Sequence, residues 1–248
     1  MPKSIKKRPP KKARTEEIPV YSELKQTIAR RQKAVLVAAV SAAVVLALAA
    51  GLYFHHTGTV RRANGYNARG YALFYGLSPE APASDQLRYQ QALSWFEKAY
   101  GERKSAYSLY YIGASQYELG QYAQAVATLQ RIYSRYPDDA QFVPLSLYKL
   151  AMTELKLGKN DDALKYLRMM ENSQFDSLKD MAYYEDGRLL ESMGKKDEAR
   201  QKFAELMQKF PQSPYSMDIR AQEAAQQGAA KAGAQKQPAA QKQKKPGK

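Results

Sequence analysis

Three stretches of the chain carry the same pattern of glycine, alanine and large apolar residues. They are residues 106–139, 144–177 and 180–213, which have equal length and align without internal gaps. The positions that coincide are Gly120, Gly158 and Gly194; Ala125, Ala163 and Ala199; Leu129, Leu167 and Phe203; and Ile132, Met170 and Leu206. A period within roughly 20–50 residues is typical of a stacked array, in which each unit buries its apolar face only against its neighbours. This pattern constrains the fold more than any other feature of the sequence.

Each unit has the pattern of two helices, A and B, joined by a tight turn. A small residue eight positions into helix A allows helix B to approach closely; these residues are Gly113, Ala151 and Gly187. The glycine that follows takes the positive φ that ends helix A. Alanine and two large apolar residues, spaced by four and three, form one face of helix B. Pro137 and Pro211 then end helix B, and Phe175 takes that place in the middle unit. We therefore expect an all-α fold.

These residues resemble the tetratricopeptide repeat (TPR). The resemblance implies a TPR-type helical solenoid over residues 106–213, in which the A helices line a concave surface that binds other proteins.

Weaker copies of the pattern flank the three units. Residues 60–105 are expected to form a degenerate first repeat, with Tyr66 to Leu73 in helix A, Tyr89 to Ala99 in helix B and a long proline-containing loop between them. Residues 214–227 are expected to form a capping helix with a polar outer face, which keeps the end of a solenoid soluble. Residues 228–248, rich in Lys, Gln and Ala, are expected to be a disordered tail.

Residues 34–54 form an uninterrupted run without charge. As a helix the run is about 31 Å long, the thickness of a bilayer core, and Tyr53 and Phe54 stand at its far end, where aromatic rings favour the interface. We expect one transmembrane helix. A cleaved signal peptide is the alternative, with Ala47-Leu48-Ala49 as the cleavage site. A buried core helix fits poorly, because the run is apolar on all faces.

The orientation follows from the charges that flank this run. Residues 1–33 hold 11 Lys and Arg against 3 Asp and Glu, and they form a basic leader expected to be disordered. The alternative for Tyr21 to Lys33 is a short helix that runs into the membrane span. The positive-inside rule places this leader in the cytoplasm and the repeats outside. The leader can also contact anionic lipid head groups. The small-residue stripe Ala39, Ala43, Ala47 and Gly51 would suit a helix dimer, but the sequence leaves the oligomeric state open.

Composition excludes several classes of function. The chain has no cysteine, and its two histidines, His55 and His56, are adjacent, so thiol catalysis, spaced metal sites and histidine triads are not expected. The net charge of +15 comes mainly from the two ends, because residues 34–220 hold 22 basic and 20 acidic side chains. A nucleic-acid-binding domain would carry that charge on its folded part. We expect no enzyme activity, no metal, no cofactor and no nucleic acid.

The candidate binding surface comes from the TPR resemblance, which assigns certain helix A positions to the concave groove. The residues carried over are Tyr107, Tyr110, Tyr117, Tyr148, Met152, Tyr184 and Arg188. Tyr110, Tyr148 and Tyr184 occupy one position in all three units, and a ladder of tyrosines suits apolar contact with a peptide, with hydroxyls left to bond its backbone. Lys156 and Arg188 are the only cations expected there, which disfavours recognition of a carboxyl terminus. The alternatives are that these tyrosines only pack helix on helix, or that the C-terminal helix fills the groove.

The layout of leader, anchor and repeats resembles the ancillary Sec translocon subunit family of bacteria. That resemblance implies a single-pass protein of the bacterial inner (cytoplasmic) membrane, with its TPR domain in the periplasm, that binds exported polypeptides or chaperones. The alternative is a structural scaffold or assembly subunit of a cell-envelope machine, such as a secretion, pilus, outer-membrane or division complex.

Overall fold

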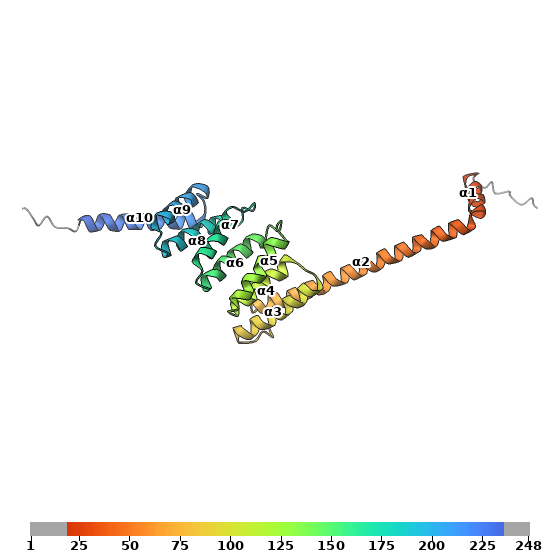
Figure 1. Ribbon diagram of the computed structural model, residues 1–248, viewed down its shortest axis with the longest axis horizontal. Coiled ribbons are helices and arrows are strands. Elements are labelled where there is room, and N and C mark those ends of the chain that lie inside the picture. Colours follow the sequence, from red (N-terminus) through yellow and green to blue (C-terminus); the bar gives the residue numbers. More distant parts are fainter. Residues whose placement is uncertain (1–18, 236–248) are drawn as a thin grey trace, which may run out of the picture. The chain divides into compact units, whose positions relative to one another are not determined.

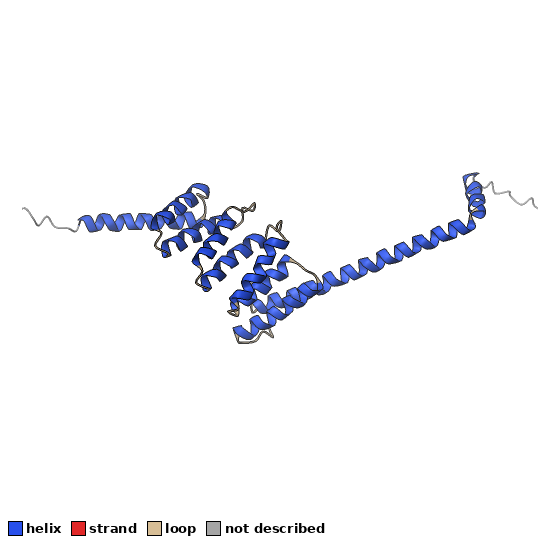
Figure 2. Cartoon of the chain, in the orientation of Figure 1, coloured by secondary structure: helices blue, strands red, loops and turns tan. Residues whose placement is uncertain are grey.

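The computed structural model describes residues 19–235, and all regular structure in that range is helical (Figures 1 and 2). Most of the expected disordered leader (1–18) and the end of the expected tail (236–248) lie outside the described residues. The chain divides into two compact units, residues 1–58 and 59–248.

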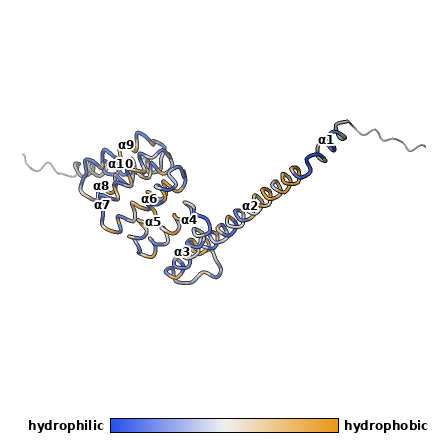
Figure 3. Tube along the Cα trace, turned by 45° about the vertical axis from the view of Figure 1, so that its right-hand side comes forward, coloured by the Kyte–Doolittle hydropathy of each residue, from blue (hydrophilic) through white to orange (hydrophobic). Residues whose placement is uncertain are grey.

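The first unit contains α1 (Pro19–Arg30) and the first part of α2 (Gln32–Phe74). The apolar residues of α2 lie in this part, as the hydropathy colouring shows (Figure 3). Their side chains are exposed, with Leu46 at 70% and Leu52 at 72%. Among the described residues α2 is the one helix long and apolar enough to cross a membrane.

One continuous helix joins the apolar segment to the repeats. The sequence pattern indicates separate helices over residues 34–54 and around Tyr66, but α2 runs from Gln32 to Phe74. Residues 55–74 contain no proline, and the glycines Gly58 and Gly65 remain helical. The helix ends where Gly76 takes a φ of +65°.

The second unit is a stack of antiparallel helix pairs. The end of α2 pairs with α3, as the contact of Phe74 with Tyr89 shows, and three further pairs and a last single helix follow. Their bounds are α3 (Asp85–Glu102), α4 (Ala106–Glu118), α5 (Tyr122–Arg135), α6 (Phe142–Lys156), α7 (Asn160–Glu171), α8 (Lys179–Ser192), α9 (Lys196–Lys209) and α10 (Pro214–Gln235). Each helix from α3 to α9 packs on the next one in the chain. The expected all-α fold of helical repeats is confirmed.

The turn and the close contact within each pair have the causes expected from the sequence. Gly120, Gly158 and Gly194 have φ of +75°, +73° and +79°, the left-handed conformation that ends an A helix. A Cβ on Gly113 would lie 2.6 Å from Leu129 Cγ, so only glycine allows this approach of α4 and α5. The expected stripe of each B helix is buried, with Leu129, Leu167 and Leu206 fully covered.

The last helix is longer than expected, and no helix B follows it among the described residues. It runs to Gln235 rather than ending near residue 227. Its first residue, Pro214, follows Asp180 by one full repeat, so α10 stands in the helix A place of a further unit. Gly228 has the register position of Gly194, but it stays helical and does not take a positive φ. A hollow of about 700 Å³ between α9 and α10, with Phe203 and Ile219 among its lining residues, lies beside this helix.

Candidate functional site

Five tyrosines form a row across the A helices of the second unit, and we call them the tyrosine row. They are Tyr75, Tyr110, Tyr117, Tyr148 and Tyr215, and all are exposed or half-buried. Burial raises the pKa of Tyr110 to about 12, with smaller contributions from the phenols of Tyr75 and Tyr148. Burial likewise raises the pKa of Tyr148, and Glu185 contributes next, followed by Tyr215 and Tyr117. Tyr110 therefore lies within electrostatic reach of Tyr75 and Tyr148, and Tyr148 lies within reach of Tyr117 and Tyr215. Tyr110 and Tyr148 stay protonated at neutral pH.

An aromatic cluster supports the first part of this row. The ring of Tyr111 stacks on Phe96 at 4.9 Å and contacts Tyr107 at 4.8 Å, measured between centroids. Phe142, the first residue of α6, meets both Tyr107 and Tyr110 at 5.6 Å. Tyr107 is thus half-buried and occupied with packing, whereas Tyr110 lies at the edge of the cluster. Its ring is held in place from one side.

The middle of the row carries a charged pair. Lys149 Nζ lies 4.6 Å from the centroid of the Tyr117 ring and 4.0 Å from Glu118 Oε1. Burial lowers the pKa of Lys149, and Glu118 opposes this shift. The expectation that Lys156 and Arg188 are the only cations of this surface is therefore wrong. Sequence reasoning missed Lys149 because it follows Tyr148 directly, and adjacent residues of a helix point in different directions.

The last A helix before α10 presents its tyrosine differently. Tyr184 is only 9% exposed, and its ring stacks on Tyr215 at 4.8 Å. Its hydroxyl donates to Asp218 Oδ2 at 3.0 Å and accepts from Arg188 Nη1 at 3.1 Å. Tyr215 and Asp218 both belong to α10, so the first turns of α10 cover Tyr184. The alternative in which the C-terminal helix fills the surface holds at this end, and Tyr215 replaces Tyr184 as the accessible ring.

The remaining predicted residues also divide into packed and accessible side chains. Met152 is half-buried and packs against the core, while Arg188 is exposed apart from its bond to Tyr184. Sequence reasoning missed Tyr75 and Tyr215. Tyr215 has a signal in the sequence, because it stands one full repeat after Met181, at a position that the resemblance assigns to the groove. Tyr75 has none, because it lies at the irregular end of α2.

The hydroxyls of the row decide what it can bind. Among the described residues, the hydroxyls of Tyr110, Tyr117 and Tyr148 make no hydrogen bond within the protein, and none is sealed from solvent. A row of rings with unsatisfied hydroxyls offers apolar area together with donors and acceptors for a peptide backbone.

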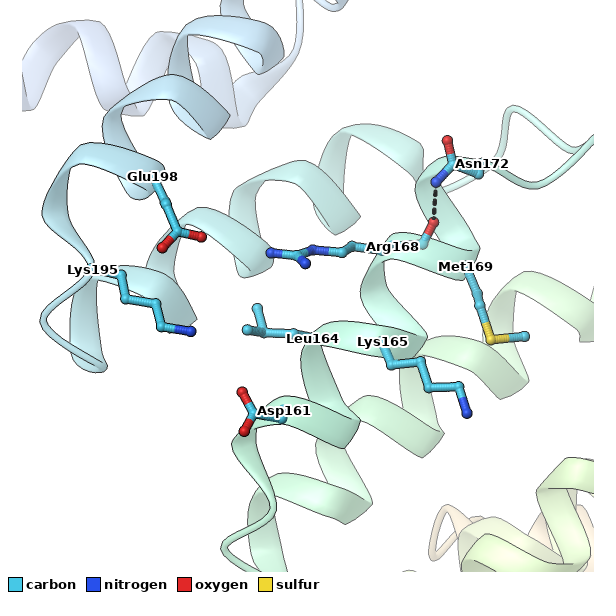
Figure 4. A pocket seen from close by; sticks show the side chains of 8 residues that line it. All are labelled: Asp161, Leu164, Lys165, Arg168, Met169, Asn172, Lys195 and Glu198. Atoms are coloured by element: carbon cyan, nitrogen blue, oxygen red, sulfur yellow. Dashed lines mark hydrogen bonds between the residues drawn. The ribbon is translucent and has the colours of Figure 1, made fainter.

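A hollow between two B helices has mixed charge. It has a volume of about 540 Å³ and lies between α7 and α9. Figure 4 shows Arg168 pointing toward Glu198 across the gap, with Lys195 and Asp161 at its mouth. In the part of the chain that the structure describes, no three His, Cys, Asp or Glu side chains are placed to hold a metal ion. Nor does this hollow pair a nucleophile with a base, so it has the character of a solvated seam between neighbouring B helices.

Comparison with known proteins supports the repeat assignment. Residues 181–213 match the family model described as tetratricopeptide repeat, and residues 85–170 match the model described as anaphase-promoting complex, cyclosome, subunit 3. No curated protein sequence matches the chain significantly.

Solved structures with a similar fold include PilW, described as a widely conserved type IV pilus biogenesis factor. PilW is 21% identical with a TM-score of 0.51 over 63% of this chain, which spans just under two thirds (66%) of PilW. MamA from Desulfovibrio magneticus RS-1 is 18% identical, with a TM-score of 0.42 over 50% of this chain and 71% of its own. The TPR2AB domain of yeast Sti1, solved as an HSP90 complex, is 18% identical, with a TM-score of 0.39 over 60% of this chain and 64% of its own. At these identities the likeness concerns the fold alone.

Proposed function

We propose that this chain is a membrane-anchored TPR module that binds other proteins along its tyrosine row. In this proposal α2 crosses the bacterial inner membrane with its N-terminus in the cytoplasm, and the repeats lie in the periplasm. There they bind exported polypeptides or chaperones near the translocon, as the resemblance to the ancillary Sec translocon subunits implies.

The observation that carries the proposal is the set of unsatisfied hydroxyls on half-buried rings. Tyrosines that only packed helix on helix would have covered rings and bonded hydroxyls, as Tyr184 has. Tyr110 and Tyr148 instead keep a covered ring edge and a hydroxyl open to solvent. Rings fixed by packing lose little conformational entropy on binding, which favours their use as anchors.

The first test measures binding by the purified full chain in nanodiscs. A fluorescently labelled, permanently unfolded polypeptide is titrated, and its anisotropy gives the dissociation constant. We expect Tyr110→Ala/Tyr148→Ala to weaken binding about tenfold or more, since each anchor contributes on the order of 1 kcal/mol. Tyr133→Ala/Tyr136→Ala, which changes two half-buried tyrosines in and beside α5, is the matched control. Equal affinity of the wild type and both variants would contradict binding along the tyrosine row.

A second candidate function is an assembly scaffold of an envelope machine; PilW, which has a similar fold, is described as a type IV pilus biogenesis factor. The covering of Tyr184 by α10 favours it, because one of the three equivalent helix A tyrosines is closed to a passing polypeptide. A pull-down from solubilised native membranes, read by mass spectrometry, separates the two. A spread of exported proteins that is lost in Tyr110→Ala/Tyr148→Ala supports the binding module. One complex of fixed stoichiometry, recovered equally with both proteins, supports the scaffold.

A further inference from the structure

The first helix pair of the second unit has a charge that the other repeats lack. Residues 59–105 hold seven Lys and Arg against four Asp and Glu, whereas residues 106–213 hold 14 against 15. Of the seven, Arg88 lies at the far end of the pair, bonded to Asp85 and to the carbonyl of Phe74. The other six are Arg61, Arg62, Arg69, Lys98, Arg103 and Lys104, and we call them the basic seam.

The structure brings the basic seam together along α2 and α3. Arg62 Nη2 lies 2.9 Å from Glu102 Oε2, which places the start of this part of α2 beside the end of α3. Two turns further, Arg69 and Lys98 lie over the ring of Trp95, at 5.0 and 4.3 Å from its centroid. All six cations are exposed. In the described part of the chain only Arg62 among them has a carboxylate partner.

A hollow of about 370 Å³ lies at the end of the seam. Arg103, Asn64, Asn67 and Ser105 line part of it, and two alanines and Tyr107 line the rest. A guanidinium beside amide and hydroxyl groups is suited to a phosphate oxygen. The polar part of the hollow therefore suits a phosphate headgroup.

The seam is close in sequence to the apolar segment. Arg61 follows Phe54 by seven residues, which span at most about 25 Å of chain. Any anchor made by residues 34–54 therefore holds Arg61, Arg62 and the end of α3 beside them near the bilayer surface, where the local concentration of headgroups is high. Tryptophan and arginine are also side chains that favour this interface.

We propose that the basic seam binds the anionic phospholipid headgroups of the bilayer that holds α2. The seam then holds the first repeat against the membrane face on which the repeats lie. The basic leader contacts the opposite face. The inference rests on the membrane anchor proposed above, but it is independent of the tyrosine row. An acidic protein is the competing occupant, and the continuity of the seam with the anchor favours the lipid.

The test uses two probes in the full chain. Trp95 is the only tryptophan, so intrinsic emission reports on the seam directly. The chain has no cysteine, and nothing lies within 4 Å of a Cβ added to Gly101, so Gly101→Cys accepts an environment-sensitive dye beside Arg103. Both probes are read in nanodiscs of phosphatidylcholine alone and of phosphatidylcholine with phosphatidylglycerol.

We expect a blue shift of both emissions and a loss of acrylamide quenching with the anionic lipid only, reversed by high salt because screening weakens the contacts. Arg61→Gln/Arg103→Gln/Lys104→Gln should abolish the shift. Lys165→Gln/Lys195→Gln/Lys196→Gln makes the same change of charge on exposed residues of the repeats and should keep it. Circular dichroism of each variant confirms that it is folded.

Three results would overturn the inference. The first is equal emission in both lipids, or an equal shift in the seam variant and its control. The second is the same shift when glycerol phosphate is added to nanodiscs of phosphatidylcholine alone, because then the bilayer is not the ligand. The third is failure of the chain to enter either nanodisc, which would also contradict the proposed membrane anchor. If the chain enters the nanodiscs and no shift is seen, only this inference is contradicted.

Discussion

At the scale of single residues, the joint between the second and third repeats departs from the repeat pattern. Asp186 is fully buried where the first two units have Ile112 and Leu150, and Glu171 is 7% exposed. Lys202 Nζ lies 2.9 Å from Glu171 Oε2 and 3.8 Å from Asp186 Oδ2. The same ammonium lies 3.7 Å from Glu205 Oε2, and Arg168 Nε lies 3.2 Å from Asp186 Oδ2. Even so, Glu171 Oε1 and Asp186 Oδ1 have no hydrogen-bond partner among the described residues.

This arrangement predicts a pH-dependent stability. Burial raises the pKa of Glu171 from 4.5 to about 7, while Lys202 opposes the shift and Asp186 adds to it. Between these two values the unfolded chain has lost a proton that the folded chain keeps, so the free energy of unfolding falls as the pH rises. Glu171→Gln stays neutral at both pH values. From pH 5 to pH 8, the free energy of unfolding should therefore fall less in this variant than in the wild type, by on the order of 2 kcal/mol. Urea denaturation at both pH values measures this.

The matched control for this network is Glu198→Gln, which removes an exposed carboxylate on the neighbouring helix. It should keep the wild-type change of stability between the two pH values. If Glu171→Gln kept that change too, the ionisation of Glu171 would not be its source.

At the scale of elements, the close distance between paired helices depends on the absence of one atom, the Cβ of a glycine in helix A. A Cβ on Gly113 would lie 2.6 Å from Leu129 Cγ, and one on Gly187 would lie 2.7 Å from Phe203 Cδ1. Both contacted side chains are themselves buried against other helices. The pairs therefore cannot separate without disturbing the stack, because close-packed cores respond to single methyl groups.

We expect Gly113→Ala and Gly187→Ala each to destabilise the fold by about 1–3 kcal/mol, the usual cost of overpacking. Gly101→Ala is the control, since nothing lies within 4 Å of its added Cβ, and alanine should there stabilise α3 by a few tenths of a kcal/mol to about 1. Denaturant unfolding gives all three values. Gly113→Ala at wild-type stability would mean that α4 and α5 have room to move apart.

At the scale of the whole molecule, the distribution of charge along the chain predicts the orientation proposed above. The 11 basic residues before the apolar run outnumber the six of the basic seam after it, so the positive-inside rule predicts an N-terminus in the cytoplasm.

A cysteine-free chain allows this orientation to be tested with single substitutions. In spheroplasts, an impermeant maleimide should label Gly101→Cys without permeabilisation and Ser4→Cys only after it. The opposite pattern would place the repeats in the cytoplasm. Loss of the Ser4→Cys label together with a shorter chain would show that the apolar segment is a cleaved signal peptide.

The local amino-acid sequence was enough to determine the repeats. Gly120, Gly158 and Gly194 end helices because of their own backbone freedom, and the stripe of Ala125, Leu129 and Ile132 follows from the helical period alone. Each of these choices depends on residues close in sequence, so a pattern of spacing reveals them.

The accessibility of the candidate site was decided by contacts between distant segments. Tyr110 and Tyr184 share one repeat position, yet Tyr184 is covered, because Tyr215 and Asp218 of α10 pack on its ring and hydroxyl. Tyr75 and Lys149 belong to the surface because of residues on another helix: Tyr75 lies near Tyr110, and Lys149 lies beside Tyr117. The burial of Asp186 beside Glu171 and Lys202 has the same origin. Which side chains remain open, and which charges are enclosed, depends on what packs across the stack, and the repeat period carries no information about that.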